Sequence, residues 1–299
     1  MMSGVMKPER ELSVKEIVSR SFNLYSTRFI DFSLLTPYLL AALITGSLTM
    51  IVYEILPLPP TPQPSAPLEE FSRLLSRFLL VGFVSLIVGT IVSGLTVKYA
   101  SDLMERGEAS LQAGFSFTVA RFTSLLAAGL IIGFSVILGA FCFIVPGIIF
   151  IIIFTLVTPV IIIERLGVLE SLRRSRRLVS KRWGKTLVLI LILDTIVGVT
   201  AGVATILVKP LGPAGPIASN LLTAGIQPLT PIASTLLYYS MTAKEAATAQ
   251  PLRLCLHCGH QTPPDAVFCP QCGKKIEGRD EKETLTEPAS QTHALKPFG

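Results

Sequence analysis

A block of basic residues between two long apolar runs is the feature that most constrains how this chain can fold. Residues 148–163 carry no charge, the segment from Glu170 to Lys185 is rich in Lys and Arg, and the apolar run TLVLILIL follows at once. Apolar runs of this kind predict membrane spans, and Lys and Arg beside spans are retained on the cytoplasmic side. The block therefore predicts a cytosolic loop between two spans.

The composition of the chain also favours a membrane protein over a soluble one. Over 299 residues the mean hydropathy is +0.61 and 15% of the residues are charged, whereas soluble domains carry about 25% charged residues. The net charge of +6 would suit nucleic acid, but the cations cluster beside the apolar runs, where anionic lipid headgroups lie. We therefore expect the lipid bilayer as a partner, and no nucleic acid.

Six apolar runs predict an all-α, multi-pass membrane fold, because each is close to the roughly 20 residues that cross the hydrocarbon core. The third run breaks at Pro146-Gly147, and Pro228 or Pro231 bends the sixth. The fourth is short and contains Pro159, so it is expected to borrow residues at one end or to thin the bilayer. The expected spans are residues 32–53, 78–97, 122–145, 148–163, 186–208 and 217–241.

The distribution of basic residues predicts the orientation. Of the 26 Lys and Arg residues, 23 fall in the N-terminal segment, residues 98–121, residues 164–185 and the C-terminal region, whereas Arg73, Arg77 and Lys209 fall on the other side. This asymmetry predicts that both termini are cytoplasmic in the cell membrane. Six spans agree with this prediction, because it requires an even number.

Residues 12–29 predict an amphipathic helix before the first span. Ser13 and Glu16 have the spacing of a capping box, in which each side chain bonds the backbone N–H of the other. Apolar residues then recur at helical spacing among Lys and Arg. The helix is expected to lie on the membrane surface; the alternative is a helix packed on the protein's own loops.

Four of the five cysteines form a pattern that predicts a zinc site. Cys255 and Cys258 form one Cys-x-x-Cys pair, and Cys269 and Cys272 form a second. Four thiolates in two such pairs can close a tetrahedral shell around a structural Zn²⁺ ion, and a reducing cytosol leaves thiolates free for metal. The pattern is similar to a zinc ribbon over residues 253–276.

Two further features of this segment bear on the zinc prediction. Gly259 and Gly273, each directly after a second cysteine, permit the positive-φ turn that aims backbone N–H groups at sulfur. His257 or His260 could replace a cysteine, although the spacing favours the four sulfurs. A closed four-sulfur shell leaves no position for a reacting water, so a structural site is expected.

Asp194 interrupts the fifth run and is a second candidate site. An intramembrane carboxyl is costly and marks a functional site by default, here a proton relay or a cation site with Asn220 or Gln227. The alternative is a neutral or hydrogen-bonded side chain with a purely structural role.

The basic segment predicts a third site, on an amphipathic helix. Val168, Leu172, Ser175 and Val179 fall on one helical face, and Trp183 follows as an interfacial anchor. Basic residues cover the rest of the helix and are expected to contact lipid headgroups, with a phosphate-substrate site as the alternative. These basic residues are Arg173, Arg174, Arg176, Arg177, Lys181 and Arg182.

Two pairs of glycines at four-residue spacing predict close helix packing within the chain. They are Gly129 and Gly133 in the third run, and Gly198 and Gly202 in the fifth. Small residues at this spacing let helix backbones approach closely in a bilayer.

Parts of the chain also resemble a known membrane-domain family. The pattern PGIIFIIIFTLVTPVIIIE followed by ESLRRSRRLVSKRWGK, the opening LSVKEIVSRSFNLYSTRF and the closing LLYYSMTAKEA resemble the six-span membrane domain attached to some glycerophosphodiester phosphodiesterases, and many uncharacterised prokaryotic proteins. The resemblance covers about residues 12–245 and implies a topology. Catalysis in those enzymes belongs to a separate barrel with His and carboxylate metal ligands, which this chain lacks, so the activity does not carry over.

These features together predict the domain organisation and the function. We expect an N-terminal amphipathic helix (residues 1–30), a six-span domain (31–245), a zinc ribbon (252–276) and a disordered tail (277–299). The expected function is a non-enzymatic membrane scaffold whose cytosolic ribbon docks a protein partner or stabilises the C-terminus. The alternative is a transporter or channel component that uses Asp194.

Overall fold

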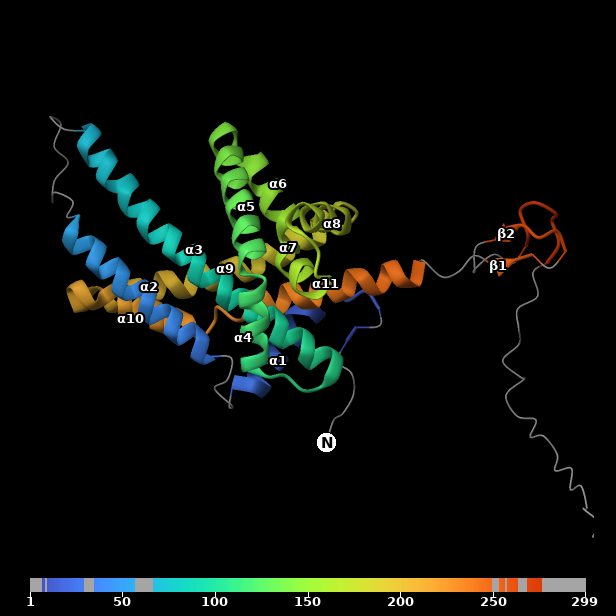
Figure 1. Ribbon diagram of the computed structural model, residues 1–299, viewed down its shortest axis with the longest axis horizontal. Coiled ribbons are helices and arrows are strands. Elements are labelled where there is room, and N and C mark those ends of the chain that lie inside the picture. Colours follow the sequence, from blue (N-terminus) through green and yellow to red (C-terminus); the bar gives the residue numbers. More distant parts are fainter. Residues whose placement is uncertain are drawn as a thin grey trace, which may run out of the picture. The chain divides into compact units, whose positions relative to one another are not determined.

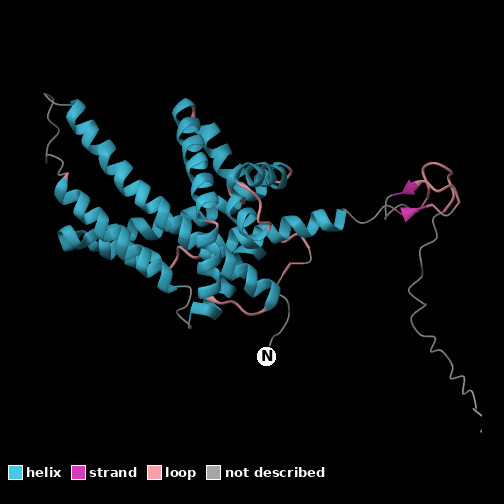
Figure 2. Ribbon diagram, in the orientation of Figure 1, coloured by secondary structure: helices cyan, strands magenta, loops and turns pink. Residues whose placement is uncertain are grey.

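The computed structural model is almost entirely helical (Figure 2) and divides into two units, Met1–Glu245 and Ala246–Gly299. The structure describes residues 7–8, 10–29, 35–56, 67–248, 253–255, 257–262 and 268–275. The expected tail at residues 277–299, and residues 57–66 of a proline-rich loop, lie outside the described residues. The helices of the first unit are α1 (Val14–Phe29), α2 (Leu35–Ile55), α3 (Pro67–Arg106), α4 (Leu111–Ala120), α5 (Phe122–Cys142), α6 (Ile144–Phe154), α7 (Val157–Ile163), α8 (Val168–Ser180), α9 (Trp183–Val208), η1 (Lys209–Ala214), α10 (Gly215–Ala224) and α11 (Leu229–Thr248).

Five helical stretches in the described part of the chain are long and apolar enough to cross a membrane. The last of them runs from Trp183 to Glu245 and contains α9, η1, α10 and α11. Length and composition therefore identify a multi-pass, all-α membrane protein, as the sequence predicted.

A central core joins α1, the last turns of α3, α7, α8, the start of α9 and α11. From it α2 and α3 extend as one pair of helices and α5 and α6 as another (Figure 1). The outward parts of these helices carry exposed apolar side chains such as Phe78, Phe134 and Phe141. This pattern suits helices that meet lipid, because lipid tails are as apolar as leucine.

Prolines explain where the membrane helices break. Pro159 has no N–H to offer the carbonyl of Thr155, and its ring crowds that group, so α6 ends at Phe154 and α7 begins at Val157. Pro228 ends the turn between α10 and α11, so the predicted bend in the sixth run is confirmed.

Several predicted boundaries were wrong. The second span belongs to a helix of 40 residues, α3, because the charged residues at its ends are good helix formers and pair at i,i+4, as Glu69 does with Arg73. The expected loop at residues 98–121 contains α4. The third span ends at Cys142, and Pro146 lies in the first turn of α6, where a missing N–H costs nothing.

Most of the predicted glycine packing was also wrong. A Cβ atom on Gly133, Gly198 or Gly202 would meet nothing within 4 Å among the described atoms. The close approach occurs instead between α5 and α6, where a Cβ atom on Gly139 would lie 2.9 Å from the backbone nitrogen of Gly147. Spacing alone does not tell which face of a helix meets its neighbour.

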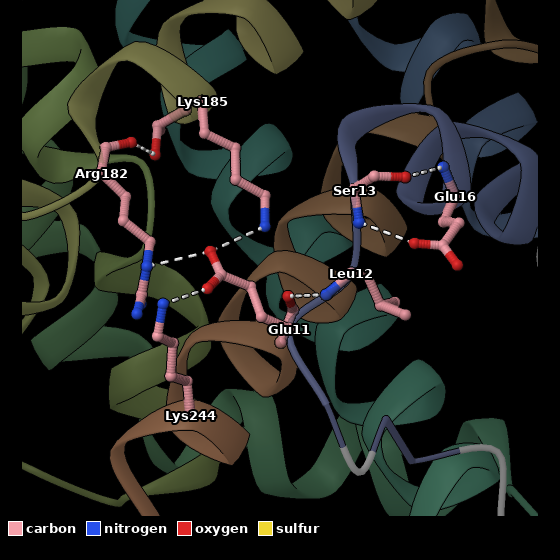
Figure 3. A network of polar contacts seen from close by, with 9 residues as sticks. Glu11, Leu12, Ser13, Glu16, Arg182, Lys185 and Lys244 are labelled. Carbon is pink, nitrogen blue, oxygen red and sulfur yellow. Dashed lines mark hydrogen bonds and ion pairs between the residues drawn. The ribbon is translucent and has the colours of Figure 1, made fainter. Parts of the chain in front are cut away.

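The N-terminal helix packs on the protein. Ser13 and Glu16 form the predicted capping box, with N–H to carboxylate and N–H to hydroxyl distances of 2.8 and 3.2 Å (Figure 3). Ile17 and Leu24 are buried in the central core. The apolar face of α1 is therefore covered by protein, which agrees with the alternative of a packed helix.

Glu11, just before α1, connects distant parts of the first unit. Its carboxylate lies 2.9 Å from Arg182 Nε, 3.1 Å from Lys185 Nζ and 2.9 Å from Lys244 Nζ (Figure 3). Burial on its own would raise the pKa of Glu11, but hydrogen bonds from Lys244 and Lys185 outweigh it and hold the pKa below its ordinary value. We call these four residues the Glu11 cluster.

Replacing Glu11 by glutamine is expected to destabilise the first unit by about 1–3 kcal/mol at pH 7, because three cations lose their counter-charge. A lowered folded-state pKa contributes stability above the ordinary value of 4.5, and this stability is lost as the pH falls through the folded-state pKa. The difference in apparent Tm between wild type and Glu11→Gln should therefore shrink at acid pH, as measured by thermal unfolding in detergent.

Glu69→Gln is the matched control for this prediction. It breaks an exposed pair within one helix, Glu69 with Arg73, and should change stability by less than about 0.5 kcal/mol. Equal effects of the two substitutions would show that the Glu11 cluster has no special role.

Candidate metal centre and intramembrane cavity

The second unit places the four predicted cysteines on two similar turns. Strands β1 (Arg253–Leu254) and β2 (Gln261–Thr262) pair antiparallel on either side of the first turn, and an isolated bridge between Phe268 and Lys275 flanks the second. Each Cys-x-x-Cys pair thus lies at the tip of a short hairpin.

The two cysteine turns have the same backbone geometry. Gly259 and Gly273 have φ of +69° and +68°, and each donates its N–H to the carbonyl of the first cysteine of its turn at 2.8 Å. The positive φ that the sequence predicted is therefore confirmed at both glycines. Hydrogen bonds from the backbone N–H groups of His257 and Cys258 lower the pKa of the Cys255 thiol to about 6, so a thiolate is favoured at neutral pH.

The sulfur positions fit a zinc ion. All four Sγ atoms lie within 4.8 Å of one another, with 3.7 Å between Cys255 and Cys272 and 3.6 Å between Cys258 and Cys269. A tetrahedral ion with Zn–S bonds of about 2.3 Å requires sulfurs about 3.8 Å apart. Cys255, Cys258, Cys269 and Cys272 would therefore hold structural Zn²⁺, and its binding would supply the folding energy that so small a unit lacks.

The two alternative histidine ligands do not join this group. His257 and His260 are exposed, and the Nδ1 atom of His257 lies 3.4 Å from Lys274 Nζ. Among the described residues, only the four sulfurs converge.

Comparisons with known proteins agree with this geometry. Two short hairpins whose four cysteine sulfurs converge are typical of a zinc-ribbon module. Residues 254–276 match the family model of a zinc-ribbon domain. No curated protein and no solved structure matches the chain.

Asp194, the second predicted site, lies on α9 at a cavity of about 290 Å³ within the first unit. The cavity is also lined by hydroxyl residues of α3, α7 and α11, namely Ser93, Thr158 and Thr230. The sequence predicted Asn220 or Gln227 as a partner of Asp194, and this was wrong. The Asn220 amide donates to Thr45 Oγ1 at 3.3 Å, and Gln227 is not among the residues that line the cavity. No feature of the sequence indicated that Asp194 would lie near Ser93, Thr158 and Thr230, because these residues are far apart along the chain.

A hydrogen bond from α8 stabilises the break between α6 and α7, which lies next to this cavity. Ser175, on the predicted apolar face of α8, donates its hydroxyl hydrogen to the carbonyl of Ile153 at 2.6 Å. That carbonyl would otherwise accept from Val157 in a continuous helix. Ser175 and Val179, which the sequence placed on one face of α8 with Val168 and Leu172, are buried. Val168 and Leu172 pack at the edge of a second apolar cluster.

The third predicted site, the basic face of α8, is smaller than expected. The Arg174 guanidinium bonds Glu164 at 2.9 Å and Glu245 at 2.7 Å, and Arg182 belongs to the Glu11 cluster. The exposed cations are Arg173, Arg176, Arg177 and Lys181. Trp183 beside them is 58% exposed, as an interfacial anchor would be.

The zinc content of variants tests the metal centre. The purified full chain should retain about one zinc ion after dialysis, and Cys258→Ser should retain less than about half of that, because one of four ligands is lost. His257→Ala, which changes an exposed neighbour outside the sulfur group, should retain the wild-type amount. Inductively coupled plasma mass spectrometry measures the metal; loss of zinc in the histidine variant alone would overturn the four-sulfur assignment.

Proposed function

We propose that this protein is a non-enzymatic, six-span membrane scaffold whose cytosolic zinc ribbon docks a cytosolic protein partner. The observation that carries the proposal is the closed shell of four thiolates next to an exposed aromatic side chain. Four protein ligands leave no open position on a tetrahedral ion, so the metal would serve structure and not catalysis.

The Glu11 cluster supports six spans with both termini on one side. Glu11 lies near the N-terminus, Lys185 lies near the start of the stretch that contains α9, and Lys244 lies near its end. Because both lysines reach one carboxylate, the chain that leaves along α9 returns along α10 and α11 to the same level. This stretch then supplies two spans, and the excess of Lys and Arg at this level favours the cytosolic side.

The surface of the ribbon supports a docking role. Phe268, directly before Cys269, is 61% exposed. Lys274 and Lys275 are exposed on the same turn. Exposed aromatic anchors with a charged rim are typical of binding hot spots, so the partner would offer an apolar pocket with acidic groups around it.

Two further parts of the proposal concern the membrane unit. We propose that it is related to the six-span domain attached to glycerophosphodiester phosphodiesterases, supported by the likeness over residues 12–245. The exposed face formed by Arg173, Arg176, Arg177 and Lys181 would contact anionic lipid headgroups, each cation adding about 1 kcal/mol.

Docking is tested by Phe268→Ala in the full chain. Crosslinking in intact cells followed by quantitative mass spectrometry should show a cytosolic protein whose recovery falls at least about tenfold, because losing an aromatic hot spot costs about 2 kcal/mol or more. The zinc content should stay unchanged.

Gln271→Ala, a truncation of an exposed polar side chain on the same turn, is the matched control and should keep the partner. Cys269→Ser with Cys272→Ser should lose it together with the metal. Unchanged recovery in both Phe268→Ala and the double cysteine variant would refute docking through the ribbon.

The second candidate function is transport, and the cavity at Asp194 favours it. An acidic group faces hydroxyls there, at the breaks of two membrane helices, α6–α7 and α10–α11. Broken helices at membrane depth commonly line the sites of transporters.

Transport predicts cation flux that depends on Asp194. Liposomes that contain the wild-type protein should dissipate an imposed proton gradient faster than protein-free liposomes, and Asp194→Asn should return the rate to background, because the only carboxylate among the described residues that line the cavity is lost. A pH-sensitive dye follows the gradient. Wild-type rates equal to background would exclude proton transport.

A further inference from the structure

Asp194 lies near the middle of α9, where its side chain is exposed beside the cavity and has no partner among the described residues. It is nine residues beyond Lys185 on α9, or about 14 Å along the helix, which is close to half of the hydrocarbon thickness. Within the described part of the chain, its carboxylate has no hydrogen bond and no ion pair, whereas the carboxylates at the level of the Glu11 cluster are paired. A carboxyl at this depth is costly unless something complements it.

Three of the five hydroxyl groups that line the Asp194 cavity make no hydrogen bond within the described part of the chain, whereas Thr155 and Ser234 bond their own helices. Most Ser and Thr side chains of these helices donate to the carbonyl one turn earlier, as Thr96 does to Val92 and Thr195 to Leu191. Ser93, Thr158 and Thr230 have no such bond among the described residues, and all three line the Asp194 cavity. Their oxygen atoms, which come from three helices, are therefore available to a ligand.

A second cavity continues the first. It has a volume of about 250 Å³, shares Ser93 and Thr158 with the first, and adds Ser85 and Thr90 of α3. No hydrogen bond from Ser85 or Thr90 occurs in the described structure either, so free hydroxyls extend along one face of α3.

The walls between these polar groups are apolar. Phe154, Leu189 and Leu193 line the first cavity, and Ile132 lines both cavities. Such walls offer nothing to a bare metal ion, but they match a hydrocarbon group. A divalent ion would moreover carry more charge than one carboxylate balances in a medium of low dielectric constant.

We propose that this cavity binds a small organic monocation, a protonated amine with a short hydrocarbon body. The ammonium group would lie against Asp194 and donate to the free hydroxyls, and the hydrocarbon would lie against Phe154 and the leucines. This proposal specifies the class of ligand for the transport alternative. It requires only that the ligand binds, and it does not depend on the ribbon.

Thermal unfolding of the full chain in detergent tests this site with n-butylammonium chloride as the probe and NaCl at equal ionic strength as the reference. A ligand that binds the folded state raises Tm in a saturable manner. The apparent affinity should fall at least about tenfold in Asp194→Asn, since the opposite charge is lost, and several-fold in Thr158→Val. Thr195→Val, which removes a neighbouring hydroxyl that bonds its own helix, should bind like wild type.

Three results would overturn the proposal. Equal stabilisation of wild type and Asp194→Asn would show that the carboxylate is not the site, and equal stabilisation by 1-butanol would show that the charge is not recognised. Stabilisation by NaCl as large as that by butylammonium would exclude selectivity for an organic cation.

If Asp194→Asn does not fold, the affinity of Thr158→Val for butylammonium tests the proposal, because this variant keeps the charge of Asp194. Binding without flux would remove only the transport function, and a failure of binding would leave the docking proposal untouched.

Discussion

The arrangement of the membrane unit depends most on the ion pairs that the carboxylate of Glu11 makes with three cations. Arg182, Lys185 and Lys244 meet at it from two separate parts of the chain. The rule that keeps cations at one membrane face also crowds like charges together, so acids must lie among them. Glu11 serves this purpose for one group of cations, and Glu164 and Glu245 serve it for Arg174. The N-terminal segment is thereby part of the membrane unit and not an appendage.

Away from this charged level, the bilayer as solvent explains the rest of the unit. Polar groups must be satisfied within the protein, because lipid offers no hydrogen bonds. Prolines break two of the helices, and the freed carbonyls find partners in other helices: Ser175 bonds Ile153, and the Tyr25 hydroxyl donates to Gly225. Ser93, Thr158 and Thr230 at the Asp194 cavity depart from this pattern, because the described part of the chain provides no hydrogen bond for them, and we therefore propose a ligand at that cavity.

The ribbon is stabilised by a different interaction. Its described residues include only two buried side chains, Cys255 and Cys269, and its strands are two residues long. So small a module cannot balance the entropy of its chain by apolar burial, so metal binding must do so. The membrane unit and the ribbon can therefore be disturbed independently, the first through ion pairs and packing and the second through its thiolates.

Local chemistry explains which features the sequence determined by itself. The apolar runs, the capping box of Ser13 and Glu16, the proline bend in the sixth run and the zinc pattern all depend on neighbours along the chain, and each could be predicted from the sequence alone. Only the tertiary structure decided which glycines face a helix, which of the basic residues of α8 remain exposed, and which hydroxyls gather around Asp194. Those properties depend on how helices rotate and pack against partners distant in sequence, and no local periodicity encodes that rotation.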